Sequence, residues 1–213
     1  MNQPESPSEI KQADKQPISV AENNELTEEN KIDFFPVSEG KLITLYILSF
    51  GVYGVYWFYK NWKLQEPMMD KKIYPVWRAI FSIFFTHALF KRIDQSASHL
   101  EKQHKFNASA LATFFVAAIV VSNILDSLAS NSGAMLNASS NSIIVISLAL
   151  FLASTYPMVK VQATVNRINN DMLGYLNHKY SLWNYVLITL GVLIWIMIAL
   201  GLLTESMGIV VPE

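Results

Sequence analysis

Five apolar segments, separated by short polar stretches, follow a polar N-terminal region. They are residues 42–59, 75–90, 108–125, 143–159 and 182–203. The last holds 22 residues without a charge, and a helix of that length, at about 1.5 Å per residue, crosses a bilayer core of about 30 Å. Backbone amides in hydrocarbon are satisfied only within helices or closed barrels. The pattern therefore predicts an all-α integral membrane protein.

The first segment, residues 42–59, is uncharged and just long enough to span a bilayer. Its far end is crowded with aromatic and basic residues: Tyr53, Tyr56, Trp57, Phe58, Tyr59, Lys60, Trp62 and Lys63. Amphipathic rings and lysines gather in this way at the headgroup level of a membrane. The same mixture occurs in platforms for single-stranded nucleic acid, but the adjoining apolar run argues against a nucleic-acid partner.

The second segment, residues 75–90, carries a polar stripe made of Arg78, Ser82 and Thr86, which are four residues apart. Both of its flanks are basic, with Lys60, Lys63, Lys71 and Lys72 before it and Lys91, Arg92, Lys102 and Lys105 after it. A helix that lies in the membrane interface, or dips in and returns, keeps both basic flanks on one side. We therefore predict an interfacial or re-entrant amphipathic helix here.

Charge in the later loops sets the predicted orientation. Residues 126–142 contain no Lys or Arg, whereas residues 160–181 contain Lys160, Arg167 and Lys179. The positive-inside bias then places the first loop outside and the second in the cytoplasm. We favour about four transmembrane helices plus the interfacial helix, with residues 42–59 either spanning or turning back within the membrane. The alternative, in which residues 75–90 also span, puts four lysines outside and breaks the charge rule once.

Two apolar stripes continue beyond the membrane segments and predict short cytoplasmic helical extensions. One is formed by Ile93, Ala97 and Leu100, and the other by Val161, Val165, Ile168 and Met172. We expect the two extensions to pack together. Pro157 lacks an amide hydrogen and crowds the preceding turn, so we expect a kink in the fourth segment.

Composition divides the chain further. Residues 1–31 contain three prolines and no aromatic residue, and up to Lys41 nine acidic residues face four lysines. We predict a disordered acidic tail over residues 1–33, a polytopic helical domain over residues 34–204 and a short tail over residues 205–213. No basic region followed by an apolar stretch lies near Met1, so we expect no cleavable signal peptide. The chain has no cysteine, which excludes disulfides and thiol chemistry.

Candidate site residues fall into two groups. We predict that Arg78, Lys60, Lys63, Trp57 and Trp62 bind lipid or a partner, because guanidinium and ammonium groups beside aromatic rings suit a phosphate headgroup. Gly51, Gly54 and Pro157 are predicted to serve helix packing.

Other polar groups admit a plainer interpretation. The four histidines lack the spacing of a metal pair, so no metal site and no cofactor is predicted. Ser122, Asn123 and Asp126 form a polar trio that suits an ion, although such residues more often mark the end of a span. The cluster Asn166, Arg167, Asn169, Asn170 and Asp171 suits a docking site, with a solvated helix end as the commoner explanation.

Three blocks of sequence carry a resemblance to a known family. They comprise Gly51, Tyr53, Gly54, Tyr56, Trp57, Tyr59, Asn61 and Trp62; Pro75, Trp77, Arg78, Ala79 and Phe81; and Val165, Asn166, Ile168 and Asn169. With them the chain, from about Phe34 to Leu203, resembles a family of small uncharacterised proteobacterial inner-membrane proteins. The resemblance implies a multi-pass protein of the bacterial inner membrane with a helical architecture. It carries no functional residues.

Enzyme signatures are missing from the chain, which has no phosphate-binding glycine loop, no nucleophile elbow and no paired histidines for zinc. We therefore expect a non-catalytic membrane protein that binds or scaffolds, and whose partners are the bilayer, anionic lipids, another envelope protein or a second copy of itself. The alternative is a small transporter or channel component. A polar path through the third and fourth segments would favour transport, and a dry bundle under a basic surface would favour binding.

Overall fold

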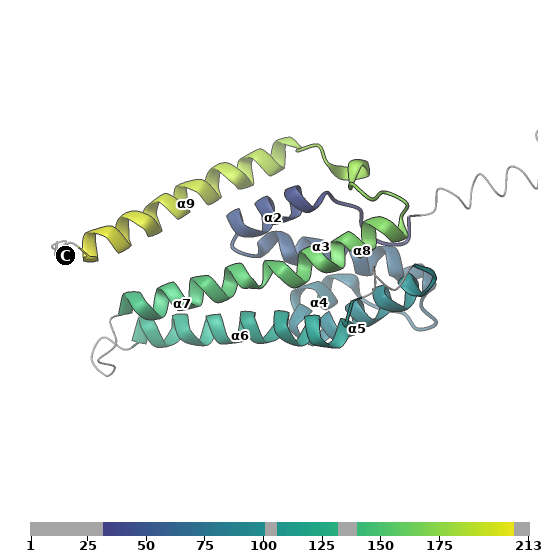
Figure 1. Cartoon of the computed structure of the whole chain (residues 1–213), viewed down its shortest axis with the longest axis horizontal. Helices are drawn as coiled ribbons and strands as arrows, with labels where there is room; N and C mark the ends of the chain where they lie inside the picture. Colours follow the sequence, from purple (N-terminus) through teal and green to yellow (C-terminus); the bar gives the residue numbers. More distant parts are fainter. Residues whose placement is uncertain (1–31, 101–105, 132–139, 207–213) are drawn as a thin grey trace, which may run out of the picture. The chain divides into compact units, whose positions relative to one another are not determined.

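The computed structural model describes residues 32–100, 106–131 and 140–206, and within these ranges it contains helices and no strand. The predicted tails at residues 1–31 and 207–213 lie outside the described residues. Figure 1 labels the helices. The helices are α2 (Glu39–Leu48), α3 (Val52–Gln65), η1 (Glu66–Met68), α4 (Pro75–Ile80), α5 (Ser82–Ser96), η2 (Ala97–His99), α6 (Ala108–Asn131), α7 (Ser140–Ala153), α8 (Thr155–Ile168), η4 (Tyr175–Asn177) and α9 (Leu182–Ser206).

Three stretches of helix are long and apolar enough to cross a membrane: Ala108–Leu128, Ser142–Ile168 and Leu182–Thr204. They coincide with the last three predicted segments. The second runs through α7 and α8 with an interruption at Ser154, one turn before Pro157. Proline leaves the carbonyl four residues before it without a partner, which explains the interruption. The prediction of a multi-pass helical membrane protein is confirmed to this extent.

The first predicted span, residues 42–59, is not one helix, so a fourth crossing is not confirmed. It is divided between α2 and α3 by a sharp turn, where Phe50 and Gly51 take left-handed φ angles of 51° and 85°. A Cβ on Gly54 would lie 2.8 Å from the ring of Tyr46, whereas a straight helix separates these positions by about 12 Å. The chain therefore reverses, and α2 and α3 form a hairpin.

The second predicted segment, residues 75–90, also bends sharply, at Phe81 between α4 and α5. Arg78 on α4 lies over the ring of Trp62, at 4.3 Å, while Arg92 on α5 reaches the Met68 carbonyl, at 3.2 Å. Trp62 and Met68 are near neighbours at the end of α3. Because a straight helix would hold the two arginines about 21 Å apart, the segment turns back on itself.

The ends of α3, α5 and α8 meet at one end of the bundle, which also holds the start of α9. We call it the basic end, because the following residues lie there: Lys41, Lys60, Lys63, Arg78, Lys91, Arg92, Arg167 and Lys179. The predicted apolar stripes are buried at this end, with Ile93, Ala97, Val161 and Val165 inaccessible, whereas Met172 is exposed. The opposite end, where α6 ends and α7 begins, is called the far end (Figure 1).

A ring of six side-chain amides fixes the entry of the chain at the basic end. We call it the amide cradle, and it consists of Asn61, Gln65, Gln162, Asn166, Asn169 and Asn177. These amides bind the backbone of residues 33–37, an extended segment just before α2, and donate to each of its five carbonyls. Asp33, predicted to belong to the tail, is therefore part of the folded unit.

Within the amide cradle, the amides also satisfy one another. Gln162 donates to Asn166 at 2.7 Å and accepts from the indole Nε1 of Trp57 at 2.5 Å. Gln65 accepts from Arg92 Nε at 2.5 Å. Buried amides without partners would cost about 1–3 kcal/mol each, so this completeness is what permits a polar cluster in the core. The cradle holds both ends of the α2–α3 hairpin at the basic end.

Helix α9 is the most weakly packed of the three apolar stretches. It approaches α2 through Gly191, where any side chain would collide with the Leu48 carbonyl. Trp195 then donates from Nε1 to the Ile47 carbonyl at 3.3 Å and stacks on Phe50 with ring centroids 5.1 Å apart. The tip of the hairpin is thus covered by α9.

Candidate functional site

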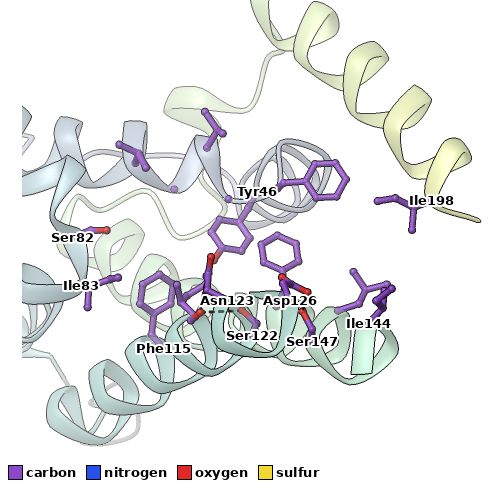
Figure 2. Close-up of a pocket in the computed structure, with 18 of the residues that line it drawn as sticks. Tyr46, Ser82, Ile83, Phe115, Ser122, Asn123, Asp126, Ile144, Ser147 and Ile198 are labelled. Atoms are coloured by element: carbon purple, nitrogen blue, oxygen red, sulfur yellow. Dashed lines mark hydrogen bonds between the residues drawn. The ribbon is translucent and has the colours of Figure 1, made fainter. Parts of the chain in front are cut away.

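A cavity of about 770 Å³ lies between the hairpin tip, the bend at Phe81, and the far-end halves of α6, α7 and α9 (Figure 2). Its wall is mainly apolar. The lining residues include Phe50, Val52, Val55, Phe58, Ile80, Ile83, Phe115, Ile119, Ile144, Leu148, Phe151, Ile198 and Leu202. Both irregular turns of the backbone, at Gly51 and between Ile80 and Ser82, therefore border the same space.

One polar cluster interrupts this wall on the α6–α7 side. Ser147 of α7 donates a hydrogen bond to the carboxylate of Asp126 on α6. Ser122 and Asn123 lie one turn earlier on α6, and their side chains donate to the Ile119 carbonyl at 3.0 and 2.7 Å. Figure 2 shows the four residues gathered along one side of the cavity, across from Ile198 on α9. The polar trio seen in the sequence thus faces the cavity and gains Ser147.

Aromatic side chains form the floor of the cavity, on its side toward the basic end. Tyr46 stacks on Phe151 with ring centroids 5.4 Å apart, and its hydroxyl shares a hydrogen bond of 2.8 Å with the buried Ser154. Phe58 packs beside Phe115, with centroids 5.9 Å apart. Below them, Trp57 joins the amide cradle. No polar side chain of the cavity reaches the cradle in the described ranges.

This arrangement suits the binding of a molecule with one polar group and one apolar body. A carboxylate and an amide oxygen accept hydrogen bonds, so the polar cluster favours a group that donates, such as an amine or a hydroxyl. The aromatic and aliphatic wall favours an apolar chain or ring. The cavity falls within the range of about 300–1,000 Å³ that is typical of ligand sites.

Two of the predicted binding residues lie inside the protein instead of at its surface. Trp57 is 0% exposed and Trp62 is 1% exposed. The indole of Trp57 donates to Gln162 in the amide cradle, and Trp62 packs under Arg78 and against Phe85. Neither ring is placed to touch lipid directly. The aromatic block that suggested a membrane belt is mostly core, because the hairpin turns it inward.

The three predicted basic residues are dispersed around the basic end. Lys60 lies 5.5 Å over the ring of Phe35, and Lys63 forms an exposed ion pair of 2.7 Å with Glu66. Exposed pairs of this kind contribute little stability. Arg78 lies over the rings of Trp62 and Phe85, so each of the three cations has different partners. The structure therefore does not unite them into one site.

The three residues predicted to serve helix packing, Gly51, Gly54 and Pro157, lie in closely packed parts of the protein. Gly54 lies against Tyr46 and Gly51 forms the turn, with its N–H donating to the Tyr46 carbonyl at 2.9 Å. Pro157 is buried in α8. Gly51 and Gly54 are three residues apart, and both contact Tyr46 across the hairpin turn of the same chain.

Sequence reasoning missed most of the amide cradle, and of the cavity it noticed the polar trio and the two glycines but not the apolar wall. Asn61 and Gln65, and likewise Gln162 and Asn166, are four residues apart and so share one helical face. Amides repeated at that spacing, without charges, are the signal that could have revealed the cradle. The predicted docking cluster is divided by the structure, since Asn166 and Asn169 bind residues 33–37 whereas Asn170 is exposed.

Comparison of the chain with protein-family models, with curated proteins and with solved structures gives no match.

Proposed function

We propose that this protein is a non-catalytic membrane protein that binds an amphiphilic molecule of the lipid class in the cavity at its far end. One observation carries the proposal: a cavity of about 770 Å³ with a mainly apolar wall and a single polar cluster. The ligand's donor group, an amine or a hydroxyl, contacts Asp126 and Asn123. Its apolar body lies against Phe50, Phe115 and Ile119.

The proposed placement in the bilayer follows from the three apolar helices and the charges. α6, α7–α8 and α9 cross the membrane, which puts the α6–α7 connection on the side opposite the basic end. The positive-inside bias then puts the basic end in the cytoplasm of a bacterial cell, at the inner membrane. The α2–α3 hairpin and the α4–α5 pair enter from the cytoplasmic side and return to it. Irregular backbone at membrane depth needs protein around it, and α9, which covers the hairpin tip, supplies it.

This placement explains how a ligand reaches the cavity. α9 contacts the hairpin near Leu48 and Phe50, and its far-end half, with Ile198 and Leu202, only borders the cavity. A molecule already dissolved in the outer leaflet therefore enters beside α9 without crossing a charged surface. Binding of this kind agrees with the expectation of a binding protein drawn from the sequence.

A small transporter is the second candidate, and Asp126 together with the re-entrant hairpin favours it. Ionisable groups and broken helices at membrane depth are common in transport pathways. Against transport, the aromatic rings of Tyr46, Phe58 and Phe115 line the cavity on the side toward the basic end. Transport would require the hairpin to move, whereas binding requires no change.

Two glycine substitutions test the proposal as a matched pair. A Cβ on Gly201 would meet nothing within 4 Å, and Gly201 borders the cavity, so Gly201→Phe fills the space without strain. Gly40 has equally open surroundings but lies at the basic end, so Gly40→Phe is the control. The wild type and each variant are extracted from the membrane of the producing cell with a mild detergent. Native mass spectrometry then measures the mass of each protein together with its bound molecules.

We expect the wild type and Gly40→Phe to carry a bound amphiphile that Gly201→Phe lacks. Equal retention by all three proteins would contradict the proposal. A solute flux in liposomes that Gly201→Phe abolishes, without any retained amphiphile in the wild type, would favour the transporter instead.

A further inference from the structure

We propose a second binding site, at the basic end and separate from the cavity, in which Arg78 and Arg92 together bind the phosphate group of an anionic phospholipid. Guanidinium groups present their N–H donors in a planar fork that matches phosphate oxygens. Two of them on neighbouring helix ends form such a site where no carboxylate competes for their donors.

Arg78 is held in place by aromatic rings. Its guanidinium lies 4.3 Å from the ring centre of Trp62 and 5.1 Å from that of Phe85. The one hydrogen bond of the guanidinium within the described ranges is a weak contact of 4.0 Å from Nη1 to the sulfur of Met69. The ring contacts fix the plane of the guanidinium and leave most of its donors unused.

Arg92 approaches the same place from α5. Its Nε donates to Gln65 and its Nη2 donates to the Met68 carbonyl, which leaves Nη1 for another acceptor. Burial and the nearby Arg92 lower the pKa of Arg78 from its usual value. Among the described residues, neither arginine forms an ion pair with a carboxylate. An anion between the two would relieve this unbalanced positive charge.

The indole N–H of Trp62 is a buried donor whose acceptor is missing from the part of the chain that the structure describes. Trp62 is 1% exposed, and its Nε1–H has no acceptor among the described residues although it is buried. A buried donor without an acceptor costs about 1–3 kcal/mol, so native proteins rarely tolerate one without cause. This donor belongs to the ring that supports Arg78.

The surface around the arginines favours a lipid over a free phosphate. Trp77, Phe81 and Phe84, on the α4–α5 bend, are all exposed, and Phe84 is 76% exposed. An exposed apolar surface next to two cations suits a phospholipid, because the acyl chains contact the apolar side chains while the phosphate contacts the cations. Tyr74, 61% exposed at the start of α4, suits the headgroup level where tyrosine gathers.

The test measures how tightly the full-length protein retains phosphatidylglycerol, against phosphatidylcholine, in native mass spectra of protein released from mixed nanodiscs. We expect Arg78→Gln to weaken phosphatidylglycerol retention about tenfold, in line with the loss of a charge-assisted contact. Arg78→Lys keeps the charge but not the fork, so we expect an intermediate loss. Lys160→Gln removes the same charge from α8, away from the site, and should change retention less than twofold.

Inorganic phosphate, added as a competitor, separates the two sources of the ligand chemistry. Displacement of phosphatidylglycerol by phosphate in the wild type would support a phosphate site that also takes free anions. Resistance to phosphate, together with the loss in Arg78→Gln, would support a lipid headgroup site. Equal retention of phosphatidylglycerol by the wild type, Arg78→Gln and Arg78→Lys would overturn the proposal. Because Arg78→Lys preserves the ring contacts, a folding failure of Arg78→Gln alone does not decide the result.

Discussion

At the basic end, six side-chain amides, four of them buried, bind residues 33–37, whereas at the far end Ser122, Asp126 and Ser147 border a cavity. Both regions place polar side chains on apolar helices. In the amide cradle each group is bonded to protein, so the region is rigid and its function is structural. In the cavity the polar groups cluster on one side of an apolar space, which leaves room for another molecule.

The two regions are connected through the α2–α3 hairpin. The amide cradle anchors both ends of the α2–α3 hairpin, and the hairpin tip at Phe50 and Gly51 forms part of the cavity wall. The amide cradle therefore helps to position the wall of the cavity. Changes in the cradle should destabilise the fold, while changes in the cavity should alter binding with little effect on stability.

The largest expected effect follows from breaking the cradle with Gln162→Leu. Gln162 takes part in three buried hydrogen bonds, to Phe35, Asn166 and Trp57, and its loss leaves their partners unsatisfied. We expect a loss of about 4 kcal/mol in the free energy of unfolding, measured by denaturant titration in micelles. Gln95→Leu, at an exposed position on α5, is the control and should cost less than about 0.5 kcal/mol. Equal losses for the two variants would show that the cradle does not anchor the fold.

A second variant tests the attachment of α9. Gly191→Leu places a side chain where the Leu48 carbonyl already lies, so α9 must move away from the hairpin. We expect a loss of about 2–3 kcal/mol and a change in the fluorescence of Trp195, which stacks on Phe50. Gly201→Leu, on the same helix with open surroundings, should retain the stability of the wild type. A stable Gly191→Leu would mean that α9 does not contact α2 in the membrane.

The floor of the cavity is tested by Tyr46→Phe. The substitution removes the hydroxyl that bonds to Ser154 and keeps the ring that stacks on Phe151. We expect a loss of about 1 kcal/mol in thermal or denaturant unfolding. Tyr74→Phe, at an exposed position, should be neutral. If Tyr46→Phe is also neutral, the floor is looser than the structure indicates.

The smallest effect on stability is expected for Ser147→Ala. Ser147 donates to Asp126, which borders the cavity, so water can replace the lost hydroxyl. We expect about 0.5 kcal/mol, roughly an eighth of the effect of Gln162→Leu. A loss comparable with that of Gln162→Leu would contradict the distinction between a closed region and a hollow one.

The sequence was sufficient to predict the three long apolar helices, because length and absence of charge alone define them. It also predicted the buried stripes at Val161, Val165 and Ile93 from their spacing. It left open whether residues 42–59 span or turn back, because the composition of an apolar segment is the same for a straight helix and for a hairpin. Gly51 was noticed as a packing residue, and its role in the turn depends on a φ angle that composition does not encode.

The cradle and the cavity were hidden for a different reason. Each amide in the cradle resembles an ordinary surface residue until the extended segment that it binds, at residues 33–37, is in place. The cavity depends on residues from seven helices, and no short motif joins Val55, Ile83, Asp126, Ser147 and Ile198. Both features arise from long-range packing.

The most direct test of the central claim compares the accessibility of the two regions, and the absence of cysteine from the chain makes it simple. Asn123→Cys places a thiol on the cavity wall, and Ser154→Cys places one in the closed floor, where Ser154 is 0% exposed. We expect a small water-soluble thiol reagent to modify Asn123→Cys in the folded protein, and we expect Gly201→Phe to slow this reaction. Ser154→Cys should react only after the protein unfolds. Equal reaction rates at the two positions, or a rate at Asn123→Cys that Gly201→Phe leaves unchanged, would contradict the central claim.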